Sequence, residues 1–533
     1  MPNCEICGKP SEKGEGAIIQ INGGDLFFCN RAHAQLFLSG SVHAKRAVGD
    51  NALSKDSVLI YARAIEKYGE EIPADVEREL FWDLYMEQGT TLQWTGDAYR
   101  EYIEPFFMLM DARCAAKKTP FSVLEIGYGI GNNSYLLRHA DSAVGLDISQ
   151  KMLDFAPVNP EIEKLKHDIV FDTKFKDNEF EFGMSVKTLQ HVPPEQIQDA
   201  VKNFARVCKN ILVVESCHPN HAFESGYAFL HKNLADMFID EGMYMARCMY
   251  PKEKCENTLI FFFTKDPLIS IIVPSKDQAK FLKRCVDSVL DQDHENVEVI
   301  VVDSSIDESP ELLKKYDDPR LRVFYEPACG LAHARNTGMK LAIGDFLIFL
   351  DSDDAMKYDR VRRQLAKFKD FPETGVVYTG MEIVDSEGKT QNIIPALPFN
   401  MEQWLPAQYI GISTCMFSRD AVVHVGLFDE HFKMCEDTDY IARVVGNRFP
   451  MLHVNEALTI YTTHDDAMTK NVYMMNKEFA KFVVKHKISF ELALSRVQKF
   501  NNPNAIYAIC DGYREACEIW GEYPDHAKRS QPK

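Results

Sequence analysis

Apolar and polar positions divide most of the chain into two series of short strands, each alternating with amphipathic segments. The first series occupies residues 122–126, 143–146, 182–186, 211–215 and 258–263, and the second occupies 269–273, 297–302, 321–325 and 346–350. Buried strands that alternate with helices indicate a parallel sheet wrapped by helices. We therefore predict two α/β domains in succession. Helical spacing of apolar residues also predicts helices within residues 41–84 and from about residue 475 onward.

The boundary between the two series lies at Lys265-Asp266-Pro267, where proline interrupts one pattern and a new strand begins at once. A chain of 533 residues is too long for one hydrophobic core. We expect a multidomain α/β protein. Its predicted segments are a small metal-binding segment (1–40), a helical connector (41–84), two α/β domains (85–266 and 267–475) and a C-terminal helical region (476–533).

Acidic and polar residues follow several strands of the second domain. The motifs are Pro274-Ser275-Lys276-Asp277, Val302-Asp303-Ser304-Ser305, Arg335-Asn336, Asp351-Ser352-Asp353 and Glu436-Asp437. Open α/β sheets bind ligands at the carboxyl ends of their strands. A sugar diphosphate leaving group calls for a hard divalent cation held by carboxylates. A further carboxylate pair can deprotonate an acceptor hydroxyl as a general base.

In their joint order these motifs resemble the inverting, GT-A-fold nucleotide-sugar glycosyltransferases of family two, over residues 267–475. The resemblance implies a pocket for the nucleoside, lined by Pro274, Ser275, Asp277 and Asp303. It places Arg335 and Asn336 near the diphosphate or ribose, and Asp351 near the ribose or sugar. It assigns Asp353 and His464 to a manganese or magnesium ion, and Asp437 to the general base, with Glu436 beside it. The motif at Asp303 departs from the family's Asp-Asp-Gly-Ser pattern, which leaves the nucleoside open, although UDP is the usual expectation.

The first domain carries a glycine-rich turn after its first strand. Gly127, Gly129 and Gly131 alternate with larger residues, and glycine allows a tight turn and a close approach to a ligand. Such a turn alone equally fits a dinucleotide site. The acidic residue Glu125 precedes it, and Asp147 ends the next strand, where it can accept hydrogen bonds from ribose hydroxyls.

Together with Asp168, these residues resemble the class I SAM-dependent methyltransferases, which have a Rossmann-like fold. The resemblance implies that S-adenosylmethionine binds through Glu125 and the three glycines at its methionine end, through Asp147 at its ribose and near Asp168 at its adenine. His191 is a candidate base on the acceptor side, or else a packing or helix-capping residue. The neighbouring domain suggests a sugar oxygen as the methyl acceptor.

Cys4, Cys7, Cys29 and His33 form the only Cys/His cluster of this kind in the sequence. Four such ligands with no open position are the composition of a structural zinc site. The arrangement resembles treble-clef or TRASH-like zinc fingers. Its role stays open between a staple that helps a short segment to fold and a module that recruits a protein or nucleic acid.

The net charge and the apolar runs argue against two classes of protein, nucleic-acid binders and membrane proteins. A net charge of −19 argues against a general nucleic-acid binder, since phosphates are gripped by surplus Lys and Arg. No apolar run has the length of a membrane helix, and the start of the chain is polar, so we expect a cytoplasmic protein.

We predict a bifunctional glycan-modifying enzyme with a nucleotide sugar, most commonly a UDP-sugar, as donor and a glycan or glycoconjugate as acceptor. One alternative is a scaffold or recruitment protein with a silent methyltransferase domain. Another is a glycosyltransferase that acts on nucleic-acid bases, which the charge disfavours and the zinc motif keeps open.

Overall fold

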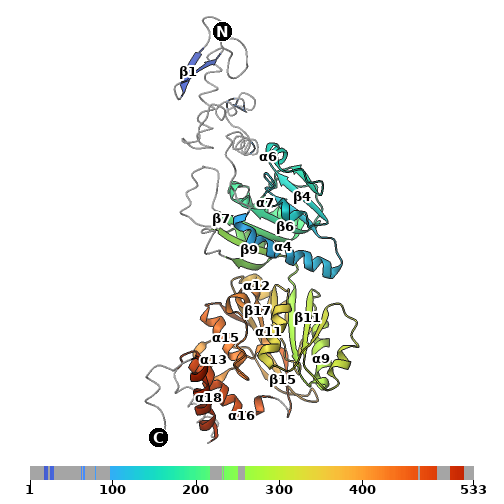
Figure 1. Ribbon diagram of the computed structural model, residues 1–533, viewed down its shortest axis with the longest axis vertical. Coiled ribbons are helices and arrows are strands. Elements are labelled where there is room, and N and C mark those ends of the chain that lie inside the picture. Colours follow the sequence, from blue (N-terminus) through green and yellow to red (C-terminus); the bar gives the residue numbers. More distant parts are fainter. Residues whose placement is uncertain are drawn as a thin grey trace. The chain divides into compact units, whose positions relative to one another are not determined.

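The computed structural model describes residues 97–216, 233–249, 258–465, 468–488 and 504–520, two strands near the N-terminus and the single residues 62, 64, 65, 79 and 231. Strand β1 (Ala17–Ile21) pairs antiparallel with β2 (Gly24–Phe28). The chain divides into two compact units, Met1–Lys265 and Asp266–Lys533 (Figure 1). No helix among the described residues is long and apolar enough to cross a membrane.

The first unit is built on a seven-stranded sheet of order β5-β4-β3-β6-β7-β9-β8. Strands β3 (Ser122–Ile126), β4 (Ser142–Asp147), β5 (Ile162–Lys166), β6 (Phe180–Val186) and β7 (Cys208–Ser216) are parallel. Strand β9 (Thr258–Thr264) runs antiparallel to β7 and to β8 (Tyr244–Met249). The sheet carries helices α4 (Asp97–Lys117), α5 (Ser134–Leu137), α6 (Gln150–Phe155), α7 (Ile197–Val207) and α8 (Leu234–Asp240), with the short 3-10 helix η2 (Leu189–His191).

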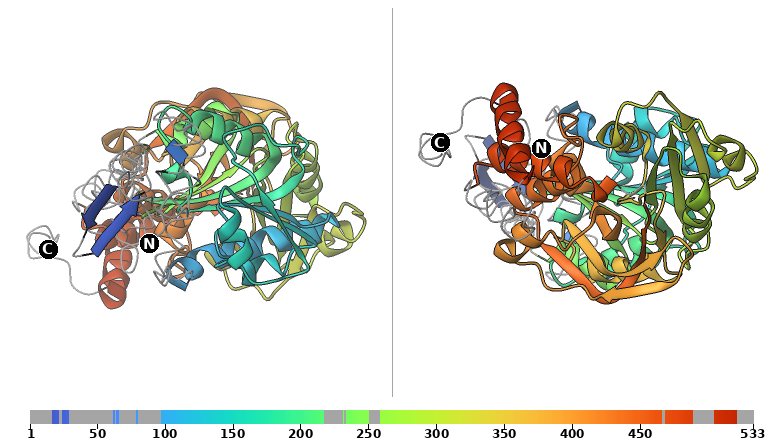
Figure 2. Two further views of the ribbon diagram at one scale, coloured as in Figure 1. Left: turned by 90° about the horizontal axis from the view of Figure 1, so that it is seen from above. Right: turned by 90° about the horizontal axis from the view of Figure 1, so that it is seen from below.

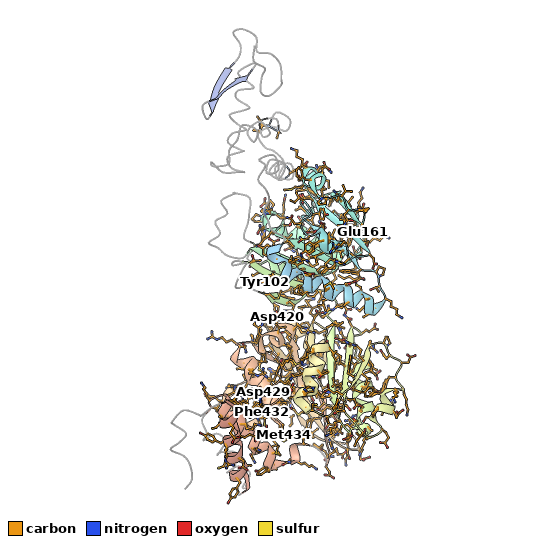
Figure 3. All side chains as sticks on the ribbon, in the orientation of Figure 1. Tyr102, Glu161, Asp420, Asp429, Phe432 and Met434 are labelled. Carbon is orange, nitrogen blue, oxygen red and sulfur yellow. The ribbon has the colours of Figure 1, made fainter. Side chains whose placement is uncertain are left out.

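Both faces of this sheet are buried, because successive residues of a strand point to opposite sides. On β7, Ile211 and Val213 enter one hydrophobic core while Leu212 and Val214 enter the other. This explains the continuous apolar runs in the sequence, which are typical of parallel strands covered on both faces. Figure 3 draws the side chains that fill the two layers.

The second unit contains a nine-stranded mixed sheet of order β12-β11-β10-β13-β17-β15-β18-β14, with β16 paired to β15. Its parallel half consists of β10 (Ile269–Ser275), β11 (Val297–Asp303), β12 (Leu321–Tyr325) and β13 (Phe346–Phe349). Strand β17 (Cys415–Ser418) reverses direction beside β13. The remaining strands are β14 (Ala355–Met356), β15 (Val376–Asp385), β16 (Thr390–Ile394) and β18 (Met451–Thr463).

Helices coloured from yellow-green to red in Figure 2 pack against this sheet. They are α9 (Ala279–Leu290), α10 (Ser309–Leu313), α11 (Leu331–Leu341), α12 (Arg360–Asp370), α13 (Met401–Ala407), α14 (Arg419–Val425), α15 (Glu436–Gly446), α16 (Val472–Lys485) and α18 (Asn504–Trp520), with 3-10 helices η3 (Ile412–Thr414) and η4 (Met468–Lys470). Phe479 and Phe482 of α16 share one core with Phe349 of β13 and Tyr440 of α15. Helix α16 is therefore packed into the core of the second unit.

Candidate active sites

Three glycines shape the loop after β3 in the first unit. Gly127, Gly129 and Gly131 all have positive φ, at 69°, 56° and 77°. A Cβ atom at Gly127 would lie 1.9 Å from Oγ1 of Thr188, which follows β6. Left-handed backbone and this close approach both require glycine here. The spacing seen in the sequence thus has a steric cause.

Asp147 connects this loop to the next one. Its Oδ2 accepts a hydrogen bond from the Gly129 amide at 2.8 Å, and its Oδ1 accepts one from the Ser149 amide at 2.9 Å. Strand β4 ends at Asp147, so its buried carboxylate lies at the carboxyl edge of the sheet. Two charge-assisted hydrogen bonds hold the two loops together at this point.

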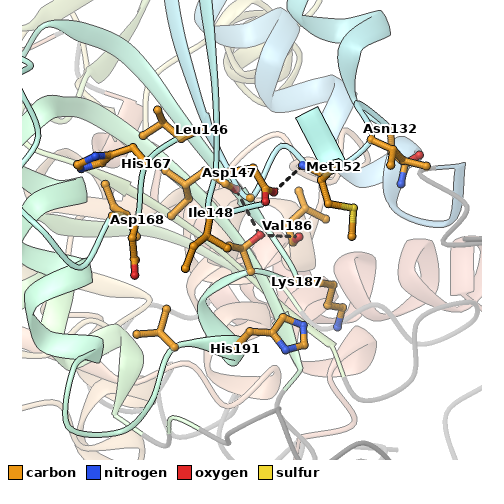
Figure 4. A pocket seen from close by; sticks show the side chains of 17 residues that line it. Asn132, Leu146, Asp147, Ile148, Met152, His167, Asp168, Val186, Lys187 and His191 are labelled. Atoms are coloured by element: carbon orange, nitrogen blue, oxygen red, sulfur yellow. Dashed lines mark hydrogen bonds between the residues drawn. The ribbon is translucent and has the colours of Figure 1, made fainter. Parts of the chain in front are cut away.

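A cavity opens at this edge of the first unit (Figure 4). Of the residues predicted from sequence, Gly127, Gly129, Asp147, Asp168 and His191 line it, whereas Glu125 and Gly131 are not among its lining residues. Much of the remaining wall is apolar, with Ile126, Ile130, Leu146, Ile148, Met152, Ile169, Val186 and Val192. A mostly apolar pocket with a few polar groups is the usual form of a small-molecule site.

Glu125 lies behind the glycine loop. Its Oε1 accepts a 2.7 Å hydrogen bond from Asn133 Nδ2, and its buried Oε2 has no hydrogen-bond partner among the described residues. Burial raises the pKa of Glu125 to about 8, against the hydrogen bond from Asn133 and with a smaller contribution from the charge of Asp147. A ligand ammonium group near this carboxyl would favour its ionised form.

Glu215, which was not predicted from the sequence, supports this site without lining the cavity. It lies near the end of β7, and its carboxylate accepts the backbone amides of Thr188, Leu189 and Gln190 at 2.8 to 3.3 Å. It thereby caps η2, the turn that carries His191. Burial raises the pKa of Glu215 to about 7, against the nearby charge of Lys187. Its position as an acidic residue near the end of an apolar strand is the feature of the sequence that could have indicated this role.

The first two motifs of the second unit meet at the ends of β10 and β11. Ser275 and Asp303 are register partners, next to Pro274 on β10. The Ser305 hydroxyl donates to Asp303 Oδ1 at 2.6 Å and accepts from the Asp277 amide at 2.7 Å. Asp303 Oδ2 and Ser275 Oγ are buried and, among the described residues, have no hydrogen-bond partner. Such atoms need a partner, and a polar ligand would supply one.

Arg335 joins two carboxylates that lie far apart in the sequence. Its Nη2 donates to Asp351 Oδ1 at 2.6 Å, and its Nη1 donates to Glu436 Oε1 at 2.5 Å. The Arg335 side chain is 1% exposed, and that of Asp351 is 32% exposed. The guanidinium is therefore occupied by the protein, while one of the carboxylates it holds remains open to solvent.

Asn336 faces away from this pair toward another segment. Its Nδ2 donates to the Phe428 carbonyl at 3.0 Å and to Glu430 Oε1 at 2.8 Å, and its Oδ1 accepts from the Phe428 amide at 2.8 Å. These contacts anchor the chain that leads into α15. The place near the diphosphate or ribose that the resemblance implies for Asn336 stays a prediction.

Asp353 and His464 come together although 111 positions separate them. His464 Nε2 lies 3.0 Å from Asp353 Oδ2. Burial raises the pKa of Asp353, the negative charge of Asp351 adds to this, and His464 opposes it. Among the residues that the structure describes, no group of three or more His, Cys, Asp or Glu side chains could hold a metal ion.

The predicted zinc ligands Cys4, Cys7, Cys29 and His33 lie outside the described residues.

Glu436 and Asp437 open helix α15, whose first turn contains three acidic residues. Negative charge is favourable at a helix N-terminus. Burial raises the pKa of Glu436 to about 7, against the charge of Arg335, and it also raises the pKa of Asp437. Glu436 is buried against Arg335, whereas Asp437 is half-buried and accepts hydrogen bonds from the Thr438 amide and hydroxyl. Asp437 is the more accessible of the two.

Both units match known families of enzyme domains. Residues 270–425 match the family described as Glycosyl transferase family 2, and residues 123–210 match a Methyltransferase domain. The second unit thus contains a family 2 glycosyltransferase domain, and the first contains a methyltransferase domain. The chain is a glycosyltransferase that also carries this second enzyme domain.

Among its relatives is TuaG of Bacillus subtilis (strain 168), named for teichuronic acid biosynthesis, with 28% identity over 40% of this chain and 85% of TuaG. Another is the glycosyltransferase GlyA of Streptococcus pneumoniae serotype 4, with 33% identity over 23% of this chain and 18% of GlyA. The crystal structure of S. aureus TarS 1-349 in complex with UDP-GlcNAc is similar at 20% identity and a TM-score of 0.37, over 47% of this chain and 82% of that one. The chain thus spans most of TuaG and less than a fifth of GlyA.

Proposed function

We propose that the second unit transfers a sugar from a nucleotide sugar to a hydroxyl of a glycan or glycoconjugate, with inversion at the anomeric carbon. We propose also that the first unit methylates an oxygen of a sugar or glycoconjugate with S-adenosylmethionine. The observation that carries the first proposal is the Arg335 bridge between Asp351 and Glu436. It brings Asp351, proposed for the donor side, close to Glu436, which adjoins the proposed base.

The donor would bind at the ends of β10 and β11. Ser275 Oγ and Asp303 Oδ2, which are buried and have no hydrogen-bond partner among the described residues, support hydrogen bonding to the nucleoside there. Asp277 shapes the same edge, because its Oδ1 accepts the Ile306 amide at 2.8 Å. Within this family a UDP-sugar is the expected donor.

Asp353 and His464 would hold a divalent cation. One carboxylate and one imidazole suit Mn²⁺, and hard divalent ions often combine one or two protein carboxylates with substrate phosphates and water. The pair therefore fits such an ion, although it offers only two protein ligands. When bound, the ion would offset the negative charge of the departing diphosphate.

The acceptor hydroxyl would be activated by Asp437. As the acceptor oxygen bonds to the anomeric carbon, the hydroxyl proton moves to the Asp437 carboxylate. The bond from the anomeric carbon to the nucleoside diphosphate breaks at the same time. A raised pKa makes a carboxylate a better base near neutral pH, and burial raises that of Asp437. Glu436, held by Arg335, would keep the guanidinium and the start of α15 in place.

In the first unit, Glu125 would attract the ammonium group of S-adenosylmethionine, and Asp147 would accept hydrogen bonds from its ribose. Asp168 and His191 both line the cavity, and Asp168 would lie near the adenine. His191 would then serve as the base that accepts the proton of the methylated hydroxyl. S-adenosylmethionine itself supplies the activated methyl group.

Mass spectrometry of reaction products tests both activities. The purified full chain is incubated with a panel of nucleotide sugars, with manganese, with S-adenosylmethionine and with an acceptor pool from cell extract. We expect acceptor masses increased by one sugar, and further products increased by one methyl group. Absence of any sugar addition across the panel would reject the proposed transfer. Sugar addition without methylation or S-adenosylmethionine binding would indicate a silent methyltransferase domain.

A further inference from the structure

The proposed base, Asp437, lies in a short segment that helix α16 holds in place. Residues 429–439, here called the base segment, run from the anchor at Asn336 into the first turn of α15 and contain Glu436 and Asp437. Cys435 within it has a positive φ of 62°. A non-glycine residue keeps such a conformation only where the surrounding structure enforces it. Helix α16 contacts the segment on both sides of Cys435, at Lys433 and at Asp439.

Lys481 of α16 binds the backbone of the base segment. Its side chain is 0% exposed, and its Nζ donates to the His431 carbonyl at 2.6 Å and lies 3.2 Å from Glu478 Oε1. Glu478 is buried too, and its Oε2 accepts the Lys433 amide at 2.9 Å. One ion pair on α16 thus binds both a carbonyl and an amide of the base segment.

Lys485 and His486 hold the two ends of the same segment. Lys485 Nζ lies 2.8 Å from Asp429 Oδ2 and 2.6 Å from Asp439 Oδ1, and His486 Nε2 lies 2.9 Å from Asp439 Oδ1. Asp429 begins the segment and Asp439 ends it. The span between them, including Asp437, is therefore fixed at both ends by one helix.

Helix α18 supports this arrangement from behind. Glu515 Oε1 lies 3.4 Å from Lys481 Nζ, and the Trp520 ring packs against Phe432 with centroids 5.4 Å apart. Figure 3 labels Asp429, which pairs with α16, and Phe432, which packs against α18. The base segment thus lies between the anchor at Asn336 and the two C-terminal helices.

Stability alone does not explain a fully buried Lys–Glu pair. Removing two charges from water is costly, and apolar residues of similar size often stabilise a core equally well or better. What the pair provides is a fixed geometry, since each charge also binds one backbone atom of the base segment. A shift of about 1 Å in a catalytic group can lower a rate about 100-fold.

We propose that Lys481 and Glu478 are positioning residues that fix the base segment so that Asp437 meets the acceptor hydroxyl. This inference rests on the proposed glycosyltransferase function. It gives the C-terminal helices a role in turnover, because they position Asp437. The proposed donor side of the site, at Ser275, Asp303 and Asp353, belongs to other elements. Loss of the pair should therefore affect turnover and leave donor binding intact.

The test compares Lys481→Met with Lys477→Met in the full chain. Lys477 lies one turn earlier on α16 and also pairs with Glu515, at 2.7 Å, so it is a matched control outside the pair that binds the base segment. We measure UDP affinity with manganese, kcat for sugar transfer, and amide hydrogen exchange. Lys481→Met should bind UDP within about twofold of wild type and lose about 100-fold in kcat. Its faster exchange should be confined to residues 429–439, and Lys477→Met should change neither quantity.

Equal kcat and equal exchange in the two variants would overturn the proposal. If Lys481→Met does not fold, the double variant Lys481→Met, Glu478→Gln removes both charges and is measured in its place, with the same expected results. If wild type transfers no sugar but Lys481→Met still loosens residues 429–439, the proposed function fails and the structural role of the pair is supported. Loss of UDP binding equal to the loss in kcat would reject positioning in favour of general destabilisation.

Discussion

The two units of this protein use the carboxylates of their candidate sites in different ways. In the first unit, Asp147 and Glu215 accept hydrogen bonds from backbone amides of adjoining loops. In the second unit, Asp351, Glu436 and Asp353 pair with the side chains of Arg335 and His464. The first site is a backbone cradle held by acids, and the second is a network of charged side chains.

This difference follows from what each site is proposed to bind. A cradle of amides and glycines fits a ligand that must be held closely and recognised along its length. A network of charges fits a reaction in which charge develops, because fixed charges stabilise a transition state without reorganising. The comparison also predicts different sensitivities. Single side-chain changes should affect turnover strongly in the second unit and binding moderately in the first.

The largest expected effect is that of Asp437→Asn on sugar transfer. The amide cannot accept the proton of the acceptor hydroxyl, so kcat should fall about 100-fold to 10,000-fold. UDP affinity in the presence of manganese should be unchanged, because Asp437 acts on the acceptor side. Initial rates and calorimetry on the same preparation measure the two quantities.

Asp353→Asn is the matched counterpart of this variant. Because the proposed ion joins the protein to the diphosphate, this variant should lose manganese-dependent UDP binding together with transfer. Equal loss of UDP binding in both variants would refute the division of roles between Asp353 and Asp437. Undiminished transfer by either variant would remove that residue from the site.

In the first unit, Asp147→Ala should weaken S-adenosylmethionine binding by about 1 to 3 kcal/mol, since buried hydrogen-bonding groups would lose their partner. Asp154→Ala is the control, because that carboxylate is exposed on α6 and pairs with Gln150. Calorimetry gives both affinities, and thermal unfolding separates a binding defect from a folding defect. Equal affinities for the two variants would contradict the role of Asp147.

Arg335→Met should move the pH dependence of sugar transfer. A base must be deprotonated to act, so kcat falls as the pH drops through the pKa of the base. Arg335 favours the ionised forms of Glu436 and Asp437, and its removal raises both pKa values further. The acidic limb of the kcat profile should move to higher pH by about 1 to 3 units. An unmoved limb in a variant that still folds, as judged by circular dichroism, would show that Arg335 does not tune the base.

The smallest expected effect is proton release when S-adenosylmethionine binds. Because the pKa of Glu125 is raised to about 8, this carboxyl is mostly protonated in the free protein at pH 6 to 7.5. The ligand ammonium favours the ionised form, so binding should release up to about one proton and strengthen as the pH rises over this range. Calorimetry in buffers of different ionisation enthalpy counts the protons. Glu125→Gln should release none, and equal release by this variant would assign the proton to another group.

Much of the fold and part of each site could be predicted from local patterns. All nine strands predicted from apolar runs are present, whereas β5, β8 and β14 to β18 were not predicted. The three glycines after β3 form the tight turn that their spacing predicted, each with a positive φ. Residues at strand ends, such as Asp147 and Asp303, lie at the sheet edge because chain direction fixes that position. The contribution of Glu215 was missed, since its strand pairs beside the site only in the folded sheet.

The amino-acid sequence by itself determined which segments become strands and helices, where glycine is needed and which acids end a strand, because these depend on neighbours within a few residues. Only the tertiary structure decided that Arg335 meets both Asp351 and Glu436, that Asn336 turns toward Phe428, and that α16 grips the base segment. Those contacts join residues up to 101 positions apart. They depend on strand order and helix packing, which local periodicity does not encode.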